Sequence, residues 1–254
     1  MLTTRVIPCL LLHNAGLVKT VRFNRPTYIG DPINAVKIFN EKEVDELIFL
    51  DIQATSKRRQ PQFTVIEEIA NECFMPFCYG GGVREIDTMK TLFRLGAEKV
   101  SINSYAVENP DFIRQAAEMF GSQSVVVALD VKKNFWGTST VVTHSATRKT
   151  GLDPVAFARD MESKGAGELL ITSVDRDGTR QGYDLDLLQR ISAAVNIPVI
   201  ACGGAATLDD FVDAVDIGGA AAVAAGSLFV YYGKHQAVLI NYPERTVVEQ
   251  LYRS

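Results

Sequence analysis

The stretch MPFCYGGGVREIDTMKTLFRLGA (residues 75–97) is matched further along the chain by IPVIACGGAATLDDFVDAVDIGG (residues 197–219). Each begins with a short apolar run, breaks into glycines and continues with apolar residues at helical spacing. The same relationship links ELIFLDIQATSKR (46–58) to ELLITSVDRDGTR (168–180), and the offset, 168 minus 46, is 122 residues in both pairs. A constant offset over such long segments indicates that the chain is built from two similar halves.

The helix starts of the two halves keep the same spacing. The dipeptides at 31–32 and 153–154 are both Asp-Pro, which joins a capping carboxylate to a proline suited to the first helical position. The first strands of the halves align at Leu11 and Asp130, which are only 119 residues apart. The loop after this strand is therefore longer in the second half.

Apolar runs of strand length alternate with amphipathic helical segments along the chain. Apolar residues three and four positions apart predict helices at 109–121 and from Thr207 onward. Eight β-α units in two equivalent halves predict a single α/β domain, a closed (β/α)8 TIM barrel over residues 1–254 with half-barrels of roughly 1–122 and 123–254. A doubly wound open sheet is the alternative, but it does not require equivalent halves. The strands are expected near 5–11, 46–52, 77–80, 98–102, 125–130, 168–173, 198–202 and 221–225.

Composition and charge argue against several classes of protein. The 254 residues carry a formal charge of -4, so no overall positive charge draws the chain to nucleic acid or to an anionic membrane. No apolar run reaches the roughly 18 residues of a membrane span, and the N-terminal run reads as a strand rather than a signal peptide. The cysteines and histidines lack metal-ligand spacing. We therefore expect no metal, no cofactor, and buried thiols in a cytoplasmic protein.

Glycines or small polar residues follow four of the expected strands, where the active site of such a barrel lies. GGG at 80–82 and INS at 102–104 form one pair, and GG at 203–204 and AGS at 225–227 form its repeat. Glycine lets backbone N–H groups approach an anion closely, so two such pairs suit a ligand with a phosphate at each end. Taken singly, each glycine run is also explained by a tight turn.

Aspartates lie at several strand ends. Asp175 and Asp177 belong to the sequence DRDGT, where capping of a turn explains an aspartate, and Asp51 ends the second strand. Asp130 ends an otherwise apolar run, so its carboxylate faces the barrel mouth or an ion pair. General acid–base chemistry usually needs groups on both faces of a substrate, and Leu11 stands where the partner of Asp130 is expected.

Motifs spread over nearly the whole chain point to one family. They are RVIPCLLL, GLVKT, GDPINA, DELIFLDI, YGGGV, GAEKVSIN, FGSQSVVVALD, GAGELLITSVDRDGT, GYD, IPVIACGGA and AAVAAGS. Together they resemble the cyclase subunit of imidazole glycerol phosphate synthase. The resemblance implies a (β/α)8 barrel that forms a heterodimer with a glutaminase subunit. In that family of lyases, ammonia from the glutaminase crosses the barrel to a substrate with two phosphates and yields imidazole glycerol phosphate for histidine biosynthesis.

The resemblance also assigns roles to individual residues. Asp130 and Lys19 correspond to catalytic residues of the family, and Leu11 stands at its second catalytic aspartate. The charged ring where ammonia enters the barrel corresponds to Arg5, Glu46, Lys99 and Glu168. Salt bridges that merely close the base of the barrel are the alternative explanation of this ring. The phosphate-binding residues correspond to Gly81, Gly82, Asn103, Ser104, Asp177, Gly178, Gly203, Gly204, Gly226 and Ser227.

Leu11 is the main departure from the family pattern, because leucine can neither take nor give a proton. Loss of a general acid or base typically costs about 10²–10⁴-fold in rate, so weak cyclase activity is expected. The stretches HNAGLVKTVRFNRPTYIGDP and ECFMPFCYGGG are similar to a divergent branch linked to sugar amidation in bacterial surface polysaccharides. This similarity implies that ammonia passes to a separate sugar amidotransferase, which converts an N-acetyl group into an acetamidino group.

Other interpretations stay open. An ordinary histidine-pathway cyclase would need a substitute for the lost aspartate, for which His13 is the nearby candidate, although a plain loop histidine is simpler. The related barrel isomerase of histidine biosynthesis needs both strand-end aspartates, and a non-enzymatic scaffold needs no intact phosphate sites. Trp136 either contacts a ligand or partner or packs within its loop, and the tail from Tyr231 is expected to close the last helix over the barrel. Charge reversal at Lys99 is expected to disturb coupling to the glutaminase more than folding.

Overall fold

Eight parallel strands close into a barrel in the computed structural model, which describes residues 4–251. They are β1 (Arg5–His13), β4 (Leu47–Asp51), β5 (Phe77–Gly80), β6 (Lys99–Ile102), β7 (Val125–Lys133), β10 (Glu168–Ser173), β11 (Val199–Cys202) and β12 (Ala222–Ala225). The ring is complete because β12 pairs with β1 and β7 pairs with β10. The prediction of a (β/α)8 barrel is confirmed, and the open sheet is wrong. Residues 1–3 and 252–254 of the predicted halves lie outside the described residues.

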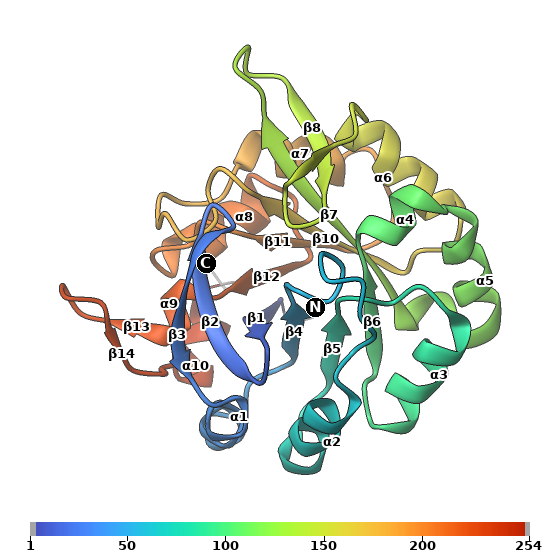
Figure 1. Ribbon diagram of the computed structural model, residues 1–254. Helices are drawn as coiled ribbons and strands as arrows, with labels where there is room; N and C mark the ends of the chain where they lie inside the picture. The colour runs from blue at the N-terminus through green and yellow to red at the C-terminus, as the bar shows by residue number, and fades with distance from the viewer. Residues whose placement is uncertain (1–3, 252–254) are drawn as a thin grey trace.

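Helices surround the barrel and cover its outer face (Figure 1). The expected caps are present, because the Asp31 carboxylate accepts a hydrogen bond of 2.9 Å from the N–H of Ile33, and Asp153 accepts one of 2.9 Å from the N–H of Ala156. The outer helices are α1 (Pro32–Glu41), α2 (Phe63–Glu72), α3 (Ile86–Arg94), α5 (Asp111–Phe120), α6 (Pro154–Ser163), α7 (Leu185–Ser192), α8 (Asp209–Asp216) and α10 (Arg245–Leu251). Shorter helical segments are α4 (Ser104–Glu108), η1 (Ser122–Ser124) and α9 (Ser227–Val230).

Two of the predicted helix starts are wrong. Helix α5 begins at Asp111 rather than at 109, because a residue that precedes proline is disfavoured from the helical conformation and Asn109, with φ of -142° and ψ of 81°, is not helical. Helix α8 begins at Asp209 rather than at Thr207. The Asp210 carboxylate accepts a hydrogen bond from the N–H of Thr207 at 2.9 Å and so holds that residue in the preceding loop.

Two connections at the C-terminal ends of barrel strands fold as antiparallel hairpins rather than as the plain loops expected from the sequence. After β1 the chain forms β2 (Gly16–Val21) and β3 (Asn24–Gly30), and after β7 it forms β8 (Ser139–Thr143) and β9 (Arg148–Lys149). Strand β2 pairs with β1 and β8 pairs with β7, so both hairpins continue barrel strands beyond the mouth. The β7–β8 hairpin stands out from the body of the molecule at the top of Figure 1.

Alternate residues of each barrel strand face the interior. From the base of the barrel to its mouth, the inward residues of β1 are Arg5, Ile7, Cys9 and Leu11. Those of β7 are Val126, Ala128 and Asp130. The other apolar strand residues pack against the helices in a larger outer core. The alternation therefore places a charged base, an apolar interior and the mouth along one axis.

The cysteines are free thiols. Cys9, Cys78 and Cys202 are buried, whereas Cys73 is only partly buried because it lies in the loop that precedes β5, so the prediction of four buried thiols is wrong at this position. Among the helices of residues 4–251, none has both the length and the apolar character needed to cross a bilayer.

The tail folds back onto the base of the barrel. It contains a small hairpin of β13 (Tyr231–Tyr232) and β14 (Ala237–Val238). Tyr242 then stacks on Phe229 with ring centroids 5.2 Å apart, and its hydroxyl donates a hydrogen bond of 2.9 Å to the carbonyl of Val6. Tyr242 therefore joins the tail to the first and last barrel units, whereas residues 232–239, which include most of the small hairpin, are exposed.

Candidate functional site

A pocket opens at the barrel mouth, where the C-terminal ends of the strands meet. Leu11 and Asp130, together with Lys19 from β2, line it. Of the ten residues that the resemblance places at phosphates, Gly82 is outside the lining. The other nine line the pocket: Gly81, Asn103, Ser104, Asp177, Gly178, Gly203, Gly204, Gly226 and Ser227. The structure therefore gathers nearly all of the sequence-predicted mouth residues around one cavity.

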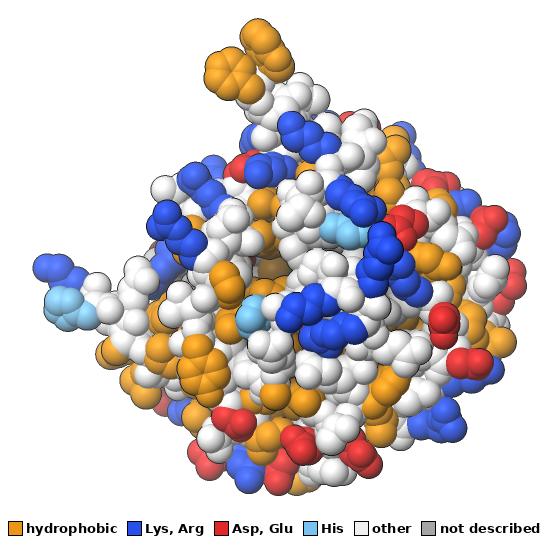
Figure 2. All heavy atoms as spheres, in the orientation of Figure 1, with side chains coloured by type: hydrophobic (Ala, Val, Ile, Leu, Met, Phe, Trp, Pro, Cys, Tyr) orange, Lys and Arg blue, Asp and Glu red, His pale blue; other side chains and the backbone are white. Residues whose placement is uncertain are grey.

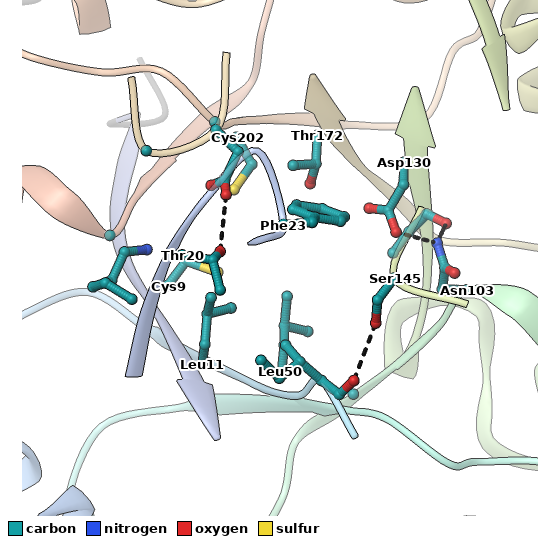
Figure 3. Close-up of a pocket in the computed structure, with 18 of the residues that line it drawn as sticks. Cys9, Leu11, Thr20, Phe23, Leu50, Asn103, Asp130, Ser145, Thr172 and Cys202 are labelled. Carbon is teal, nitrogen blue, oxygen red and sulfur yellow. Dashed lines mark hydrogen bonds between the residues drawn. The ribbon is translucent and has the colours of Figure 1, made fainter. Parts of the chain in front are cut away.

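Leu11 and Asp130 lie on opposite sides of this pocket (Figure 3). Their strands, β1 and β7, are separated by four steps around the eight-stranded barrel in either direction. Leu11 is 8% exposed and shares its side with Leu50, whereas Asp130 is beside Asn103. At these two positions an apolar side chain thus faces a carboxylate across the pocket.

Asp130 is held in place by a neighbouring amide. The Asn103 side-chain nitrogen donates hydrogen bonds to the Asp130 carboxylate at 3.2 Å and to the carbonyl of Ala128 at 2.8 Å. Burial raises the pKa of Asp130 to about 7, the negative charge of Asp177 adds to this effect, and the bond from Asn103 opposes it. A carboxyl group with such a pKa can donate or accept a proton near neutral pH.

Lys19 reaches the pocket from the β2–β3 hairpin. Its side chain is buried, and its ammonium lies so close to Gly226 that a Cβ at that position would be 2.1 Å from Nζ. Burial raises the pKa of Asp177, while Lys19 and the hydroxyl of Thr20, which donates a hydrogen bond of 3.1 Å, work in the opposite direction. An anion that enters beside Gly226 would meet the ammonium of Lys19.

Several glycines of the mouth have a structural reason to be glycine. A Cβ would come within 2.5 Å of the Asp51 carbonyl at Gly81, within 2.2 Å of the Thr20 carbonyl at Gly178 and within 2.1 Å of the Gly182 carbonyl at Gly204. Close approach of backbone to backbone therefore explains these glycines without any ligand. At Gly226 the nearest atom is the Lys19 ammonium, so here the space adjoins a positive charge.

Polar side chains at the first glycine pair are already engaged. The hydroxyl of Ser104 donates to the side-chain amide oxygen of Asn103 at 3.0 Å and accepts from the N–H of His144 at 3.0 Å. The backbone N–H of Asp177 donates a hydrogen bond of 2.9 Å to the carbonyl of Ser173. The carboxylate of Asp177 would repel a phosphate. Asp177 is therefore better suited to hold Lys19 than to contact a phosphate directly.

Two pocket residues that the sequence reasoning missed come from the hairpin turns. Phe23, at the β2–β3 turn with φ of 60°, lines the pocket, and its neighbour Arg22 donates its N–H to the Asp177 carbonyl at 2.9 Å. Ser145, in the β8–β9 turn with φ of 54°, donates to the Ile52 carbonyl at 3.0 Å. No glycine or asparagine marks these positive-φ positions, so ordinary turn signals did not find them.

The remaining strand-end candidates have local structural roles. Asp51 pairs with Arg59 at 2.9 Å and accepts backbone hydrogen bonds, and Asp175 accepts the N–H of Lys133 at 2.8 Å. The ring of His13 lies 2.8 Å from the side-chain nitrogen of Gln53 and is outside the pocket lining. His13 therefore does not stand in for the carboxylate that Leu11 lacks.

The four charged residues at the base form a closed ring of ion pairs. Arg5 contacts Glu46, and its other guanidinium nitrogen lies 2.5 Å from Glu168. Lys99 bridges the same carboxylates at 3.1 Å to Glu46 and 2.9 Å to Glu168. Among the described residues no hydrogen-bond partner is found for the second, buried oxygen of Glu46. The ring therefore alternates in charge and keeps one unused acceptor.

Known proteins are similar in sequence to this chain over almost its whole length. Residues 5–236 match the family described as "Histidine biosynthesis protein". A Pseudomonas aeruginosa protein provisionally named imidazole glycerol phosphate synthase subunit hisF2 is 51% identical over 244 residues, which are 96% of this chain and 97% of the relative. A provisionally named subunit HisF of Leptospira borgpetersenii is 47% identical over 253 residues, 99% and 100% of the two chains. A provisionally named subunit hisF3 of Vibrio vulnificus is 48% identical over 244 residues, 96% and 94%.

Proposed function

The chain belongs to the histidine biosynthesis protein family, and from this membership we propose that it is an ammonia-conducting barrel that works with a glutaminase subunit and is itself a poor cyclase. One observation carries the proposal: the apolar interior joins a charged ring at the base to a mouth in which Leu11 faces Asp130. The charged ring at the base suits the uptake of ammonia. The mouth lacks one of the two proton-transfer groups that the cyclisation requires.

The base of the barrel supports a role in taking up ammonia. The unpartnered oxygen of Glu46 could accept a hydrogen bond from ammonia or ammonium, and the interior above it is lined by apolar side chains such as Ile7 and Ile48. Neutral ammonia crosses such an interior far more easily than a charged ion, because burying an unpaired charge is costly. The ring is also asymmetric: Glu46 and Glu168 are repeat equivalents, but Lys99 has Ala221 as its counterpart. That asymmetry fits a gate toward one particular partner.

The same end supports docking of the glutaminase. Phe74 lies in the loop before β5, at the N-terminal end of the strands, and is 85% exposed. An exposed aromatic side chain at the same end of the barrel as a charged ring is typical of a protein interface, where large apolar anchors contribute most of the affinity. We therefore assign the base to the glutaminase and the mouth to the acceptor of ammonia.

The mouth supports binding of a phosphorylated small molecule. In barrels of this class a phosphate site commonly lies between the loops after strands seven and eight and the N-terminus of a short extra helix. Gly203 and Gly204 follow β11, Gly226 follows β12, and α9 begins at Ser227. The ammonium of Lys19 beside Gly226 supplies a positive charge at the same place.

The finer part of the proposal is the fate of the ammonia. We assign it to a separate sugar amidotransferase of surface-polysaccharide synthesis, in accord with the similarity of this chain to that branch. The proposal treats the chain as one cytoplasmic domain with half-barrels of roughly 1–122 and 123–254. The equivalent placement of Glu46 and Glu168 in the ring supports the two halves.

A genuine cyclase of histidine biosynthesis is the second candidate. It is favoured by Asp130, whose pKa of about 7 suits proton transfer, and by the preserved glycine pairs. It is disfavoured by Leu11, which cannot transfer a proton, and by His13, whose ring contacts Gln53 and so does not replace the missing carboxylate. The related isomerase fits less well, because it needs both aspartates and no ammonia path.

Mixing the protein with the glutaminase subunit of the same organism tests the proposal. We expect the two to co-elute on gel filtration at micromolar concentration and glutamate release from glutamine to rise several-fold. A glutaminase whose activity and elution are unchanged by the barrel would contradict the proposed function.

A further inference from the structure

The tip of the β7–β8 hairpin carries two of the three most exposed large hydrophobic side chains among the described residues, the third being Phe74. Phe135 is 94% exposed and Trp136 is 85% exposed, and their rings meet edge to face with centroids 5.5 Å apart. Figure 2 shows hydrophobic side chains at this tip, clear of the rest of the surface. Trp136 therefore packs on its neighbour rather than into its loop.

The turn that presents these rings is fixed by hydrogen bonds. The Asn134 side-chain oxygen accepts the N–H groups of Trp136 and Thr138, both at 2.9 Å. Gly137 donates its N–H to the Asn134 carbonyl at 3.0 Å and has a φ of 79°. A preorganised turn loses little conformational freedom when it binds, so its aromatic side chains are well suited to act as anchors.

The hairpin that carries the rings is basic. Residues 131–150 contain Lys132, Lys133, Arg148 and Lys149 and no aspartate or glutamate, in a chain whose net charge is -4. The Lys133 ammonium is paired with Asp184 at 2.7 Å and the Arg148 guanidinium with Glu108 at 4.0 Å, so within the described residues the positive charges of Lys132 and Lys149 are not compensated by an ion pair. Complementarity therefore calls for a partner with an acidic surface and an apolar pocket.

The hairpin is also joined to the mouth of the barrel. Asp130 lies on β7, the strand that leads to the tip, and pairs with Val142 of β8, and the N–H of Lys133 donates to the Asp175 carboxylate. Ammonia that leaves the mouth is diluted in solvent unless the consuming enzyme sits there. We propose that this hairpin docks the ammonia-consuming enzyme, through an acidic face of that enzyme with a pocket for Phe135 and Trp136. The inference rests on the proposed function and adds the surface and the chemistry of the partner.

The test is a titration of the purified sugar amidotransferase of the same organism against the barrel–glutaminase complex. The double substitution Phe135→Ala/Trp136→Ala is expected to weaken binding by roughly thirtyfold or more, as loss of a hot spot does. Lys132→Glu is expected to weaken it less and to flatten its dependence on salt. Tyr232→Ala, at an aromatic residue that is 63% exposed outside the hairpin, is the matched control and should leave binding unchanged.

The outcomes separate this inference from the proposed function. The double variant should stimulate the glutaminase as well as the wild type does, because the tip follows the C-terminal end of β7 whereas the ring lies at the N-terminal ends of the barrel strands. If the wild type fails to stimulate the glutaminase, the proposed function fails. If it does stimulate, but amidotransferase binding is absent or is unchanged in the double variant, the docking inference alone fails. Binding of the wild type, but not of the variant, to phosphatidylglycerol vesicles without affinity for the amidotransferase would reassign the tip to a membrane.

Discussion

The side chain of Leu11 lies across the barrel mouth from the carboxylate of Asp130, at the ends of strands on opposite sides of the ring. A ligand between them meets a proton donor or acceptor at Asp130 and an apolar side chain at Leu11. With leucine rather than a carboxylate at position 11, burial and the negative charge of Asp177 raise the pKa of Asp130. Both the chemistry and the pH dependence of the mouth therefore centre on Asp130.

Asp130 should make the stability of the protein depend on pH. Because burial raises its pKa from 3.8 to about 7, the folded protein retains this proton between roughly pH 4 and 7 while the unfolded chain loses it. The contribution of Asp130 to the free energy of unfolding therefore falls as pH rises through this range, by on the order of 2–4 kcal/mol. Asp130→Asn should remove this fall. Urea unfolding of both proteins at pH 5 and pH 8 checks it, and parallel profiles would show that the pKa is not raised.

Lys19 should contribute directly to anion binding at the mouth. Replacing it in Lys19→Gln removes the ammonium beside Gly226 and should weaken binding of inorganic phosphate roughly tenfold to a hundredfold, the usual effect of losing a charge-assisted hydrogen bond. Lys57→Gln, an exposed lysine, is the control. Titration by NMR and a crystal grown in phosphate provide the measurements. A crystal without phosphate at either glycine pair would remove the two-phosphate interpretation.

Lys99 should couple the barrel to the glutaminase, but charge reversal is a poor test of it. Lys99 bridges the buried carboxylates Glu46 and Glu168. Charge reversal would therefore destabilise the fold more than the sequence suggested: Lys99→Glu should lower the free energy of unfolding by about 3–5 kcal/mol. Lys99→Met leaves Arg5 to pair with both carboxylates and should reduce glutaminase stimulation several-fold with a smaller loss of stability. Lys234→Met, at an exposed lysine, is the control. Unchanged stimulation by Lys99→Met would return the ring to a purely structural role.

Restoring a carboxylate at Leu11 should restore part of the cyclase chemistry. With ammonium salt and the two-phosphate substrate of the family, Leu11→Asp should turn over about tenfold to a hundredfold faster than the wild type, less than the full effect of a general acid or base. Recovery should be incomplete because Phe23 and Leu50 still line the pocket. Leu11→Asn has similar size and no acid and should stay slow. Leu11 is buried, so thermal unfolding must show that both variants remain folded.

The sequence predicts the barrel well because its signals are local and repeated. The eight strands and the Asp31 and Asp153 caps follow from alternation and capping chemistry, and the structure has all of them, although β1 and β7 extend two and three residues beyond the predicted ends. The repeat makes Glu46 and Glu168 equivalent, but their closure with Arg5 and Lys99 depends on strands far apart in the chain. Only the resemblance to a family suggested that ring.

The hairpins could not be predicted from local rules. Their turns place Arg22, Phe23, His144, Ser145 and Ala146 at positive φ, a conformation that propensity reserves mostly for glycine and asparagine. The glycines at 81, 178 and 204 suggest an anion site from the sequence, but close backbone contacts require glycine there whether or not an anion binds. Tertiary contacts therefore decide how the mouth is built.

The most direct test of the central claim is the ratio of imidazole glycerol phosphate to glutamate formed by the complex of barrel and glutaminase. The complex is given glutamine and the two-phosphate substrate, and both products are measured in the same reaction. Because Leu11 removes one proton-transfer group while the ammonia path is kept, we expect glutamate with fewer than about one imidazole glycerol phosphate per hundred glutamates. A ratio near one would contradict the account and make the protein a working cyclase of histidine biosynthesis.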